Sequence, residues 1–181
     1  MNDASLTEAA VSLTDHPTLR LGPERDGQRR AVNALIEQAF GPGRFAKTAE
    51  RLREGNKALA HFSMVASEGD KVLGAVRLWP IRIGETPCLF LGPIAVDQAA
   101  RSQGLGAELV RASLRAIEAD AGLDAKAVLL VGEAGFFEPL GFCRVPRGAA
   151  LLPGPVDARR IFWRPIRHAP LEGVQGRVGL P

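Results

Sequence analysis

A glycine-rich loop between a strand-like run and a long helix pattern constrains the fold of this chain more than any other feature. The loop, Arg101 to Gly106, follows the apolar run Cys88 to Val96 and opens a helical pattern that extends to about Ala121. A continuous apolar run, Ala127 to Val131, comes next and is typical of a strand covered on both faces. The sequence therefore predicts a strand, helix, strand unit over residues 89–131.

The runs on either side of this unit predict a mixed sheet in an α/β (α+β) fold. Two strand-like runs, residues 59–66 and 72–83, precede the run from Cys88 to Val96, and the turn signals between them are short enough for antiparallel hairpins. Further strands are predicted at residues 18–21, 142–145 and 160–166, and further helices at residues 31–39, 45–53 and 134–140.

Length and composition favour a single globular domain. A chain of 181 residues that is 46% hydrophobic and 24% charged is long enough and apolar enough to bury a core. We expect a mobile tail at residues 1–16, one domain at residues 17–168 and a C-terminal tail at residues 169–181. No apolar run approaches the roughly 18 residues of a membrane span, and the first residues do not resemble a signal peptide, so we expect a cytoplasmic protein.

The cysteines and the charges exclude some classes of protein. Cys88 and Cys143 are too few for a disulfide framework, and their apolar, strand-like surroundings predict buried free thiols. The net charge is +3, and the arginines are scattered without a dense block, so a nucleic-acid partner is only a weak hypothesis. We expect no metal and no membrane partner.

The glycine-rich loop carries the chemistry of this sequence. A loop of this kind before a helix presents backbone N–H groups that hold phosphate oxygens. Gly104 and Gly106 remove side chains where a pyrophosphate would approach, and Arg101 adds a cation. A tight turn that needs glycine for its backbone angles alone explains the spacing equally well. A dinucleotide loop fits worse because Leu109 stands where its third glycine would be, and Ala46 replaces the second glycine of a Walker A loop.

Three segments follow one another along the chain: Leu91 to Asp97, Arg101 to Ala107, and Phe136 to Phe142. Together they resemble the core of the GNAT acetyltransferase superfamily. The resemblance is strongest over residues 72–145, moderate over residues 18–71 and absent at both ends. The Arg-x-x-Gly-x-Gly loop is moderately specific alone and becomes specific when a strand and a Leu-Gly-Phe ending follow it.

The resemblance implies a fold, an activity and a set of binding residues. The fold would be a mixed, mostly antiparallel sheet of six to seven strands with four helices and a splayed strand pair that forms the acyl-CoA cleft. The activity would be transfer of an acetyl group from acetyl-CoA to a primary amine of a small molecule or protein. The implied binding residues are Ile94, Ala95 and Val96 for pantetheine, Arg101, Ser102, Gln103, Gly104, Leu105, Gly106 and Ala107 for the pyrophosphate, and Phe137 beside the acyl group.

The sequence departs from the family pattern at Phe137. Family members often have a tyrosine there, whose phenol is taken to protonate the departing thiolate, and this chain has no tyrosine. The alternative function is therefore a non-catalytic acyl-CoA-binding or sensing module. The catalytic residues stay unassigned, because nothing in the sequence places Glu85, Glu133 or His61 at the cleft. An edge strand at residues 160–166 would offer a pairing surface for a homodimer.

Overall fold

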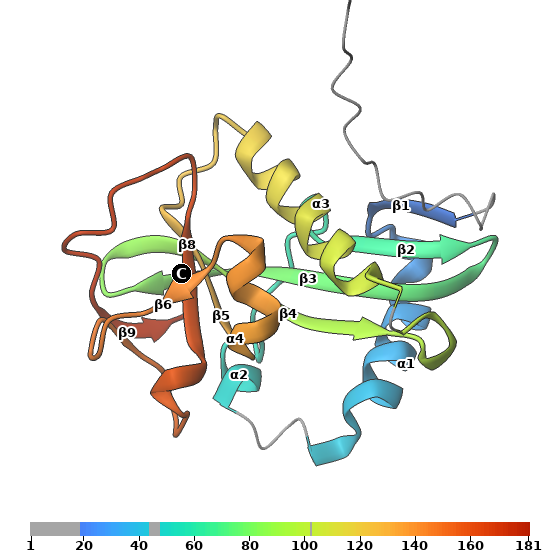
Figure 1. Ribbon diagram of the computed structural model, residues 1–181, viewed down its shortest axis with the longest axis horizontal. Helices are drawn as coiled ribbons and strands as arrows, with labels where there is room; N and C mark the ends of the chain where they lie inside the picture. Colours follow the sequence, from blue (N-terminus) through green and yellow to red (C-terminus); the bar gives the residue numbers. More distant parts are fainter. Residues whose placement is uncertain (1–18, 44–47, 102) are drawn as a thin grey trace, which may run out of the picture.

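The computed structural model describes residues 19–43, 48–101 and 103–181. It consists of one mixed sheet with helices on both faces (Figure 1). The nine strands of the described part are β1 (Leu19–Pro23), β2 (Met64–Glu68), β3 (Lys71–Ile83), β4 (Thr86–Val96), β5 (Ala127–Val131), β6 (Cys143–Arg144), β7 (Ala150–Leu151), β8 (Ile161–Pro165) and β9 (Gly176–Gly179). Its four α-helices are α1 (Arg29–Phe40), α2 (Thr48–Arg51), α3 (Leu105–Ala119) and α4 (Ala134–Phe137). Short 3₁₀ helices η1 (Asp26–Gln28), η3 (Gln98–Ala100), η4 (Glu138–Leu140) and η5 (Ala158–Arg160) join them.

The sheet has the order β1-β2-β3-β4-β5-β8-β6, and β9 pairs with both β3 and β7. Its pairs are antiparallel except for β4 with β5 and β7 with β9, which are parallel. The prediction of a mixed, mostly antiparallel sheet with about four helices is therefore confirmed. The sequence did not predict β7 or β9, because strands of two and four residues show no usable alternation of apolar and polar residues.

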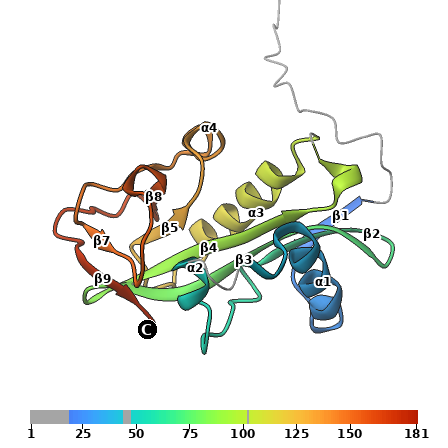
Figure 2. The same cartoon turned by 90° about the horizontal axis from the view of Figure 1, so that it is seen from below.

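The two faces of the sheet carry different helices (Figure 2). Helices α3 and α4 cover one face, whereas α1 and α2 lie on the other. Successive side chains of a strand point to opposite faces. Leu89 and Leu91 of β4 accordingly join the core under α3, and Phe90 joins a second core that contains Leu52, next to α2. Strand β4 is thus buried from both sides in the middle of the molecule.

The gap between β4 and β5 is the feature of the fold that positions the site. These two strands pair at only two places, Leu89 with Val128 and Phe90 with Leu129. Beyond Phe90, β4 continues to pair with β3, while β5 continues to pair with β8 up to Val131. The strands therefore diverge, and the splayed strand pair implied by the family resemblance is confirmed.

A β-bulge lies where the gap opens. The register between β3 and β4 shifts between Val76 and Leu78, so that Arg77 lies opposite both Gly92 and Pro93. Bulges bend a strand and often lie beside active sites. Pro93 fits here because a proline, which lacks an N–H group, is tolerated at a bulge. The Trp79 indole N–H donates a hydrogen bond of 2.7 Å to the carbonyl of Gly92.

Two elements differ most from their predicted boundaries. The strand predicted at residues 59–66 begins at Met64, because the Ser63 N–H donates to the carbonyl of Leu59 and closes a turn there. The helix predicted at residues 45–53 is the single turn Thr48–Arg51 in the described part, and residues 45–47 lie outside the described residues.

Two further expectations are wrong. The strand near residues 160–166 is not an edge strand, because β6 pairs with β8 on the side opposite β5. Cys88 is buried, as expected, but Cys143 is exposed, since β6 forms the end of the sheet and both of its side chains face solvent.

Candidate functional site

A cavity of about 870 Å³ occupies the gap between β4 and β5. Gly106 and Phe136 line it from the α3 and α4 face, and Phe40 and Thr48 line it from the α1 and α2 face. It therefore passes through the sheet and joins the two faces. The complete lining comprises Ala39, Phe40, Thr48, Ala49, Arg53, Phe90, Leu91, Gly92, Pro93, Ile94, Ala95, Val96, Arg101, Gly106, Val131, Gly132, Glu133, Phe136, Phe137, Pro155, Val156, Asp157 and Arg160.

One edge of β4 faces this cavity. Between Leu91 and Val96 the strand pairs with β3 but not with β5, so its second row of backbone groups is not used by the sheet. The Arg101 guanidinium folds back over the end of the strand, where its Nε donates a hydrogen bond of 3.2 Å to the carbonyl of Val96. Backbone groups along such an open edge can pair with the amides of an extended ligand.

The glycine-rich loop ends at the N-terminus of α3. Gly104 precedes the helix in the left-handed conformation, with φ of 75°, and no side chain caps the helix there. The first N–H groups of a helix have no partner within the helix, and they carry partial positive charge. The left-handed backbone is a sufficient reason for glycine at position 104.

Gly106 has no comparable structural reason to be glycine. It lies inside α3, where alanine is favoured by up to about 1 kcal/mol. A Cβ atom added there would make only ordinary contacts, 3.6 Å from Phe136 and 3.7 Å from Val96. Both of these residues line the cavity, so the added atom would project toward it. The absence of a side chain at Gly106 leaves the start of α3 open to the cavity.

Only some of the residues predicted to bind the donor line the cavity. Ile94, Ala95, Val96, Arg101, Gly106 and Phe137 line the cavity. Gln103, Gly104, Leu105 and Ala107 lie next to it in the chain but are not among its lining residues, and Ser102 lies outside the described residues.

An aromatic wall closes the side of the cavity under α4. Phe137 is 7% exposed, and its ring packs edge-to-face against Phe136 and Phe142 at centroid distances of 4.8 and 5.7 Å. A side chain at Gly132 would collide with the Phe137 ring. The position where the family resemblance implies a tyrosine therefore holds an apolar ring packed against the end of β5.

The loop between β7 and β8 closes the opposite side. The Thr48 hydroxyl donates a hydrogen bond of 2.7 Å to the carbonyl of Pro155, and Arg51 donates to the carbonyl of Pro153. These bonds tie the loop to α2 and bring Pro155, Val156 and Asp157 to the cavity. Sequence reasoning missed these residues, because a loop rich in proline and glycine carries no periodic signal.

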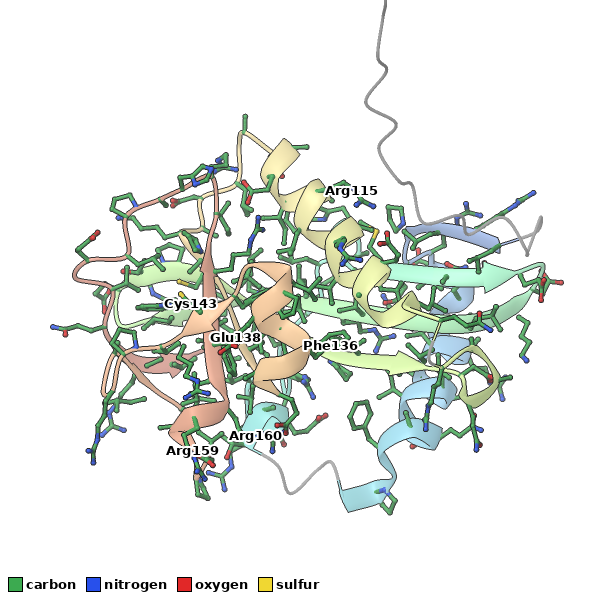
Figure 3. The ribbon with its side chains drawn as sticks, in the orientation of Figure 1. Arg115, Phe136, Glu138, Cys143, Arg159 and Arg160 are labelled. Atoms are coloured by element: carbon green, nitrogen blue, oxygen red, sulfur yellow. The ribbon has the colours of Figure 1, made fainter. Side chains whose placement is uncertain are left out.

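Charged side chains are among the lining residues of the cavity. Figure 3 labels two arginines of this region, Arg159 and Arg160. Glu133 lines the cavity and forms an ion pair of 3.0 Å with Arg160, which lines it too. The carboxylate of Asp157 also lines it, and hydrogen bonds from Arg159 lower the pKa of this carboxyl to about 2. Arg53 adds a second cation on the side of β4.

The three residues considered from the sequence as a base lie in different places. Glu133 is at the cavity, whereas Glu85 pairs with Arg82 and His61 stacks on Phe62 at 3.9 Å, and neither of these lines the cavity. The signal that could have placed Glu133 is its position two residues after β5, which runs parallel to β4, because ligands bind at the carboxyl ends of parallel strands.

Within the described ranges, no three His, Cys, Asp or Glu side chains are close enough to hold a metal ion. None of the described helices is long and apolar enough to cross a membrane.

Comparison with known proteins identifies the family. Residues 30–142 match the model of the acetyltransferase (GNAT) family, which covers more than half of the chain. The chain therefore belongs to the GNAT acetyltransferase family. No curated protein is similar enough in sequence to count as a relative.

Solved structures agree with this assignment. The GNAT family N-acetyltransferase YhbS of Escherichia coli, solved with CoA, has a TM-score of 0.75 and 23% identity, over 91% of this chain and 90% of that one. A GNAT family acetyltransferase of Brucella melitensis, solved with acetyl-CoA, has a TM-score of 0.57 and 26% identity, over 69% and 82% of the two chains. The chain thus has the GNAT fold.

Proposed function

We propose that this protein is an N-acetyltransferase that moves an acetyl group from acetyl-CoA to a primary amine of a small molecule or protein. The observation that carries the proposal is the cavity through the sheet, which opens to α3 and α4 on one face and to α1 and α2 on the other. A site open from both faces can hold a donor and an acceptor together. Direct transfer needs this proximity, since holding two reactants in contact removes much of the entropic barrier.

The donor half of the proposed site lies at α3, α4 and the open edge of β4. The uncapped start of α3 beside Gly106 suits a pyrophosphate, because helix N-termini bind anions. The free edge from Leu91 to Val96 suits the two amides of a pantetheine arm. The relatives from E. coli and B. melitensis were solved with CoA and acetyl-CoA, which supports the same donor here.

The chemistry of the acyl carrier compensates for the missing tyrosine. Acetyl-CoA supplies an activated acetyl group and a thiolate, which is a comparatively good leaving group. Phe136 and Phe137 present apolar rings to the cavity on the side of α4. Neither ring can donate a proton, so we propose that solvent entering from the α2 side, or the acceptor itself, protonates the thiolate.

The test is thiol release. Purified protein is mixed with acetyl-CoA and a broad panel of primary amines, and free thiol is measured with a chromogenic disulfide after the protein has been removed. We expect release that depends on the amine, together with a product heavier than the amine by one acetyl group. Donor binding without release for every amine would refute the proposal.

The second candidate, a non-catalytic acyl-CoA-binding or sensing module, is favoured by Phe137. The Phe137→Tyr variant separates the two functions, because a positioned acid typically contributes a factor of about 10² to 10⁴ in rate. If the unaltered protein transfers acetyl groups and Phe137→Tyr changes kcat less than about tenfold, the chain is an enzyme that does not need an acid at position 137. If only the tyrosine variant turns over, the binding module is the correct function.

A further inference from the structure

Arg53 is a mostly buried cation at the place where β4 leaves β5. Its side chain is 13% exposed, and its Nη1 lies 3.1 Å from the Glu50 carboxylate. Its Cζ lies 5.5 Å from the ring centroid of Phe90, the last residue of β4 that pairs with β5. A Cβ atom added to Gly92 would lie 3.3 Å from Nη2. The guanidinium is therefore fixed against β4 at the entrance to the gap.

Arg53 also joins the main cavity to a second one. The second cavity, of about 590 Å³, lies beneath α1 and shares Arg53 and Pro93 with the first. Trp79 lines this second cavity, and its indole bonds to the carbonyl of Gly92. A ligand group that reaches Arg53 would therefore alter the surroundings of Trp79.

The opposite wall of the main cavity carries two carboxylates that each pair with an arginine, Glu133 with Arg160 and Asp157 with Arg159. Glu133, at the end of β5, and Asp157, in the loop before β8, both line it. The cavity thus presents the Arg53 guanidinium, paired with Glu50, on the β4 side and two arginine-paired carboxylates on the other. The lining on the face of α1 and α2 is mostly apolar and includes Ala39, Phe40, Ala49, Pro155 and Val156, while the hydroxyl of Thr48 is hydrogen-bonded to the carbonyl of Pro155.

From this arrangement we infer that the amine acceptor is an α-amino acid with an apolar side chain, whose carboxylate binds Arg53; the inference rests on the proposed function. A guanidinium has five N–H donors in a planar fork, so it can bind a second carboxylate besides Glu50. The amino group then faces Glu133 and Asp157, and the side chain lies on the apolar wall. A simple amine lacks the carboxylate that would share the Arg53 guanidinium with Glu50.

The test compares amino acids with matched amines. L-phenylalanine, L-leucine and L-methionine are each titrated into CoA-saturated protein beside phenethylamine, isoamylamine and 3-methylthiopropylamine. Binding is followed by calorimetry on the unaltered chain and by the fluorescence of Trp79 in a Trp163→Phe background, since the chain has two tryptophans. We expect at least one amino acid to bind at least tenfold more tightly than its matched amine and to change the Trp79 signal.

The variant Arg53→Gln should erase this preference while CoA binding is retained. Arg115→Gln, an exposed arginine on α3, is the matched control and should leave the preference unchanged. Equal binding of the two members of every pair, no binding of any amino acid, or a preference that survives Arg53→Gln would each overturn the inference. If amino acids bind as expected but release no thiol from acetyl-CoA, the acceptor site stands and the proposed acetyl transfer fails.

Discussion

Replacing Gly106 with alanine should strengthen the fold and weaken CoA binding at the same time. The added Cβ would meet its nearest neighbours at 3.6 Å or more, so it strains nothing, and helix propensity favours alanine by up to about 1 kcal/mol. For a domain of this size, that gain raises Tm by roughly 2 to 4 °C. The same atom projects into the space where a pyrophosphate would approach α3. Losing one charge-assisted hydrogen bond costs about 1.5 to 3 kcal/mol, which is roughly a 10- to 100-fold loss of affinity.

The assay for Gly106→Ala pairs thermal unfolding, followed by circular dichroism, with calorimetric titration of CoA. Gly135→Ala is the matched control, because Gly135 is an exposed glycine in α4 with no atom within 4 Å of its added Cβ. The control should bind CoA normally. An unchanged CoA affinity in Gly106→Ala would refute the assignment of this loop to a phosphate. A lower Tm would show that glycine is needed there for packing.

The remaining predictions concern thiols and a buried ion pair. A thiol reagent should label one cysteine of the folded protein, the exposed Cys143, and two after unfolding. Burial raises the pKa of the Cys88 thiol from 9.0 to about 11, so this thiol ionises at lower pH in the unfolded chain than in the folded one. The free energy of unfolding should therefore fall between pH 9 and pH 11. Urea titrations of Cys88→Val should no longer show this fall. Glu24→Gln should cost about 3 kcal/mol, because Glu24 and Arg77 form a mostly buried pair with side chains 8% and 12% exposed. Glu85→Gln should leave the urea midpoint unchanged, because the Glu85 side chain is 99% exposed in its pair with Arg82.

The central part of the fold could be predicted from the sequence because its signals are local. The helix that became α3 has a continuous apolar face, and β5 is a run of five apolar residues, so each element is recognisable without knowledge of its partners. The glycine-rich loop placed the start of α3 correctly for the same reason. The splayed strands came from the family resemblance and not from the periodicity of the residues.

The walls of the cavity could not be predicted, because they depend on contacts between distant parts of the chain. Thr48 and Pro155 are 107 positions apart and are joined by a single hydrogen bond. Glu133 and Arg160 come from different loops and meet only when β8 pairs with β5. No local pattern records such contacts. The position of Gly106 shows a further limit, since its spacing cannot tell a turn residue from a residue that leaves room for a ligand.

The pairing of β9 with β3 has a consequence for how the molecule is assembled. Arg82 and Ile83 receive their partners, Gly179 and Val178, from the far end of the described chain. On the ribosome, the rest of the sheet can therefore form while this corner still lacks its neighbour. Ordering β9 costs backbone conformational entropy, and only a few hydrogen bonds are gained in return. We expect the amide of Gly84, which donates to the carbonyl of Arg177 in β9, to be the last protected in refolding and among the first to exchange with solvent deuterium in the native state.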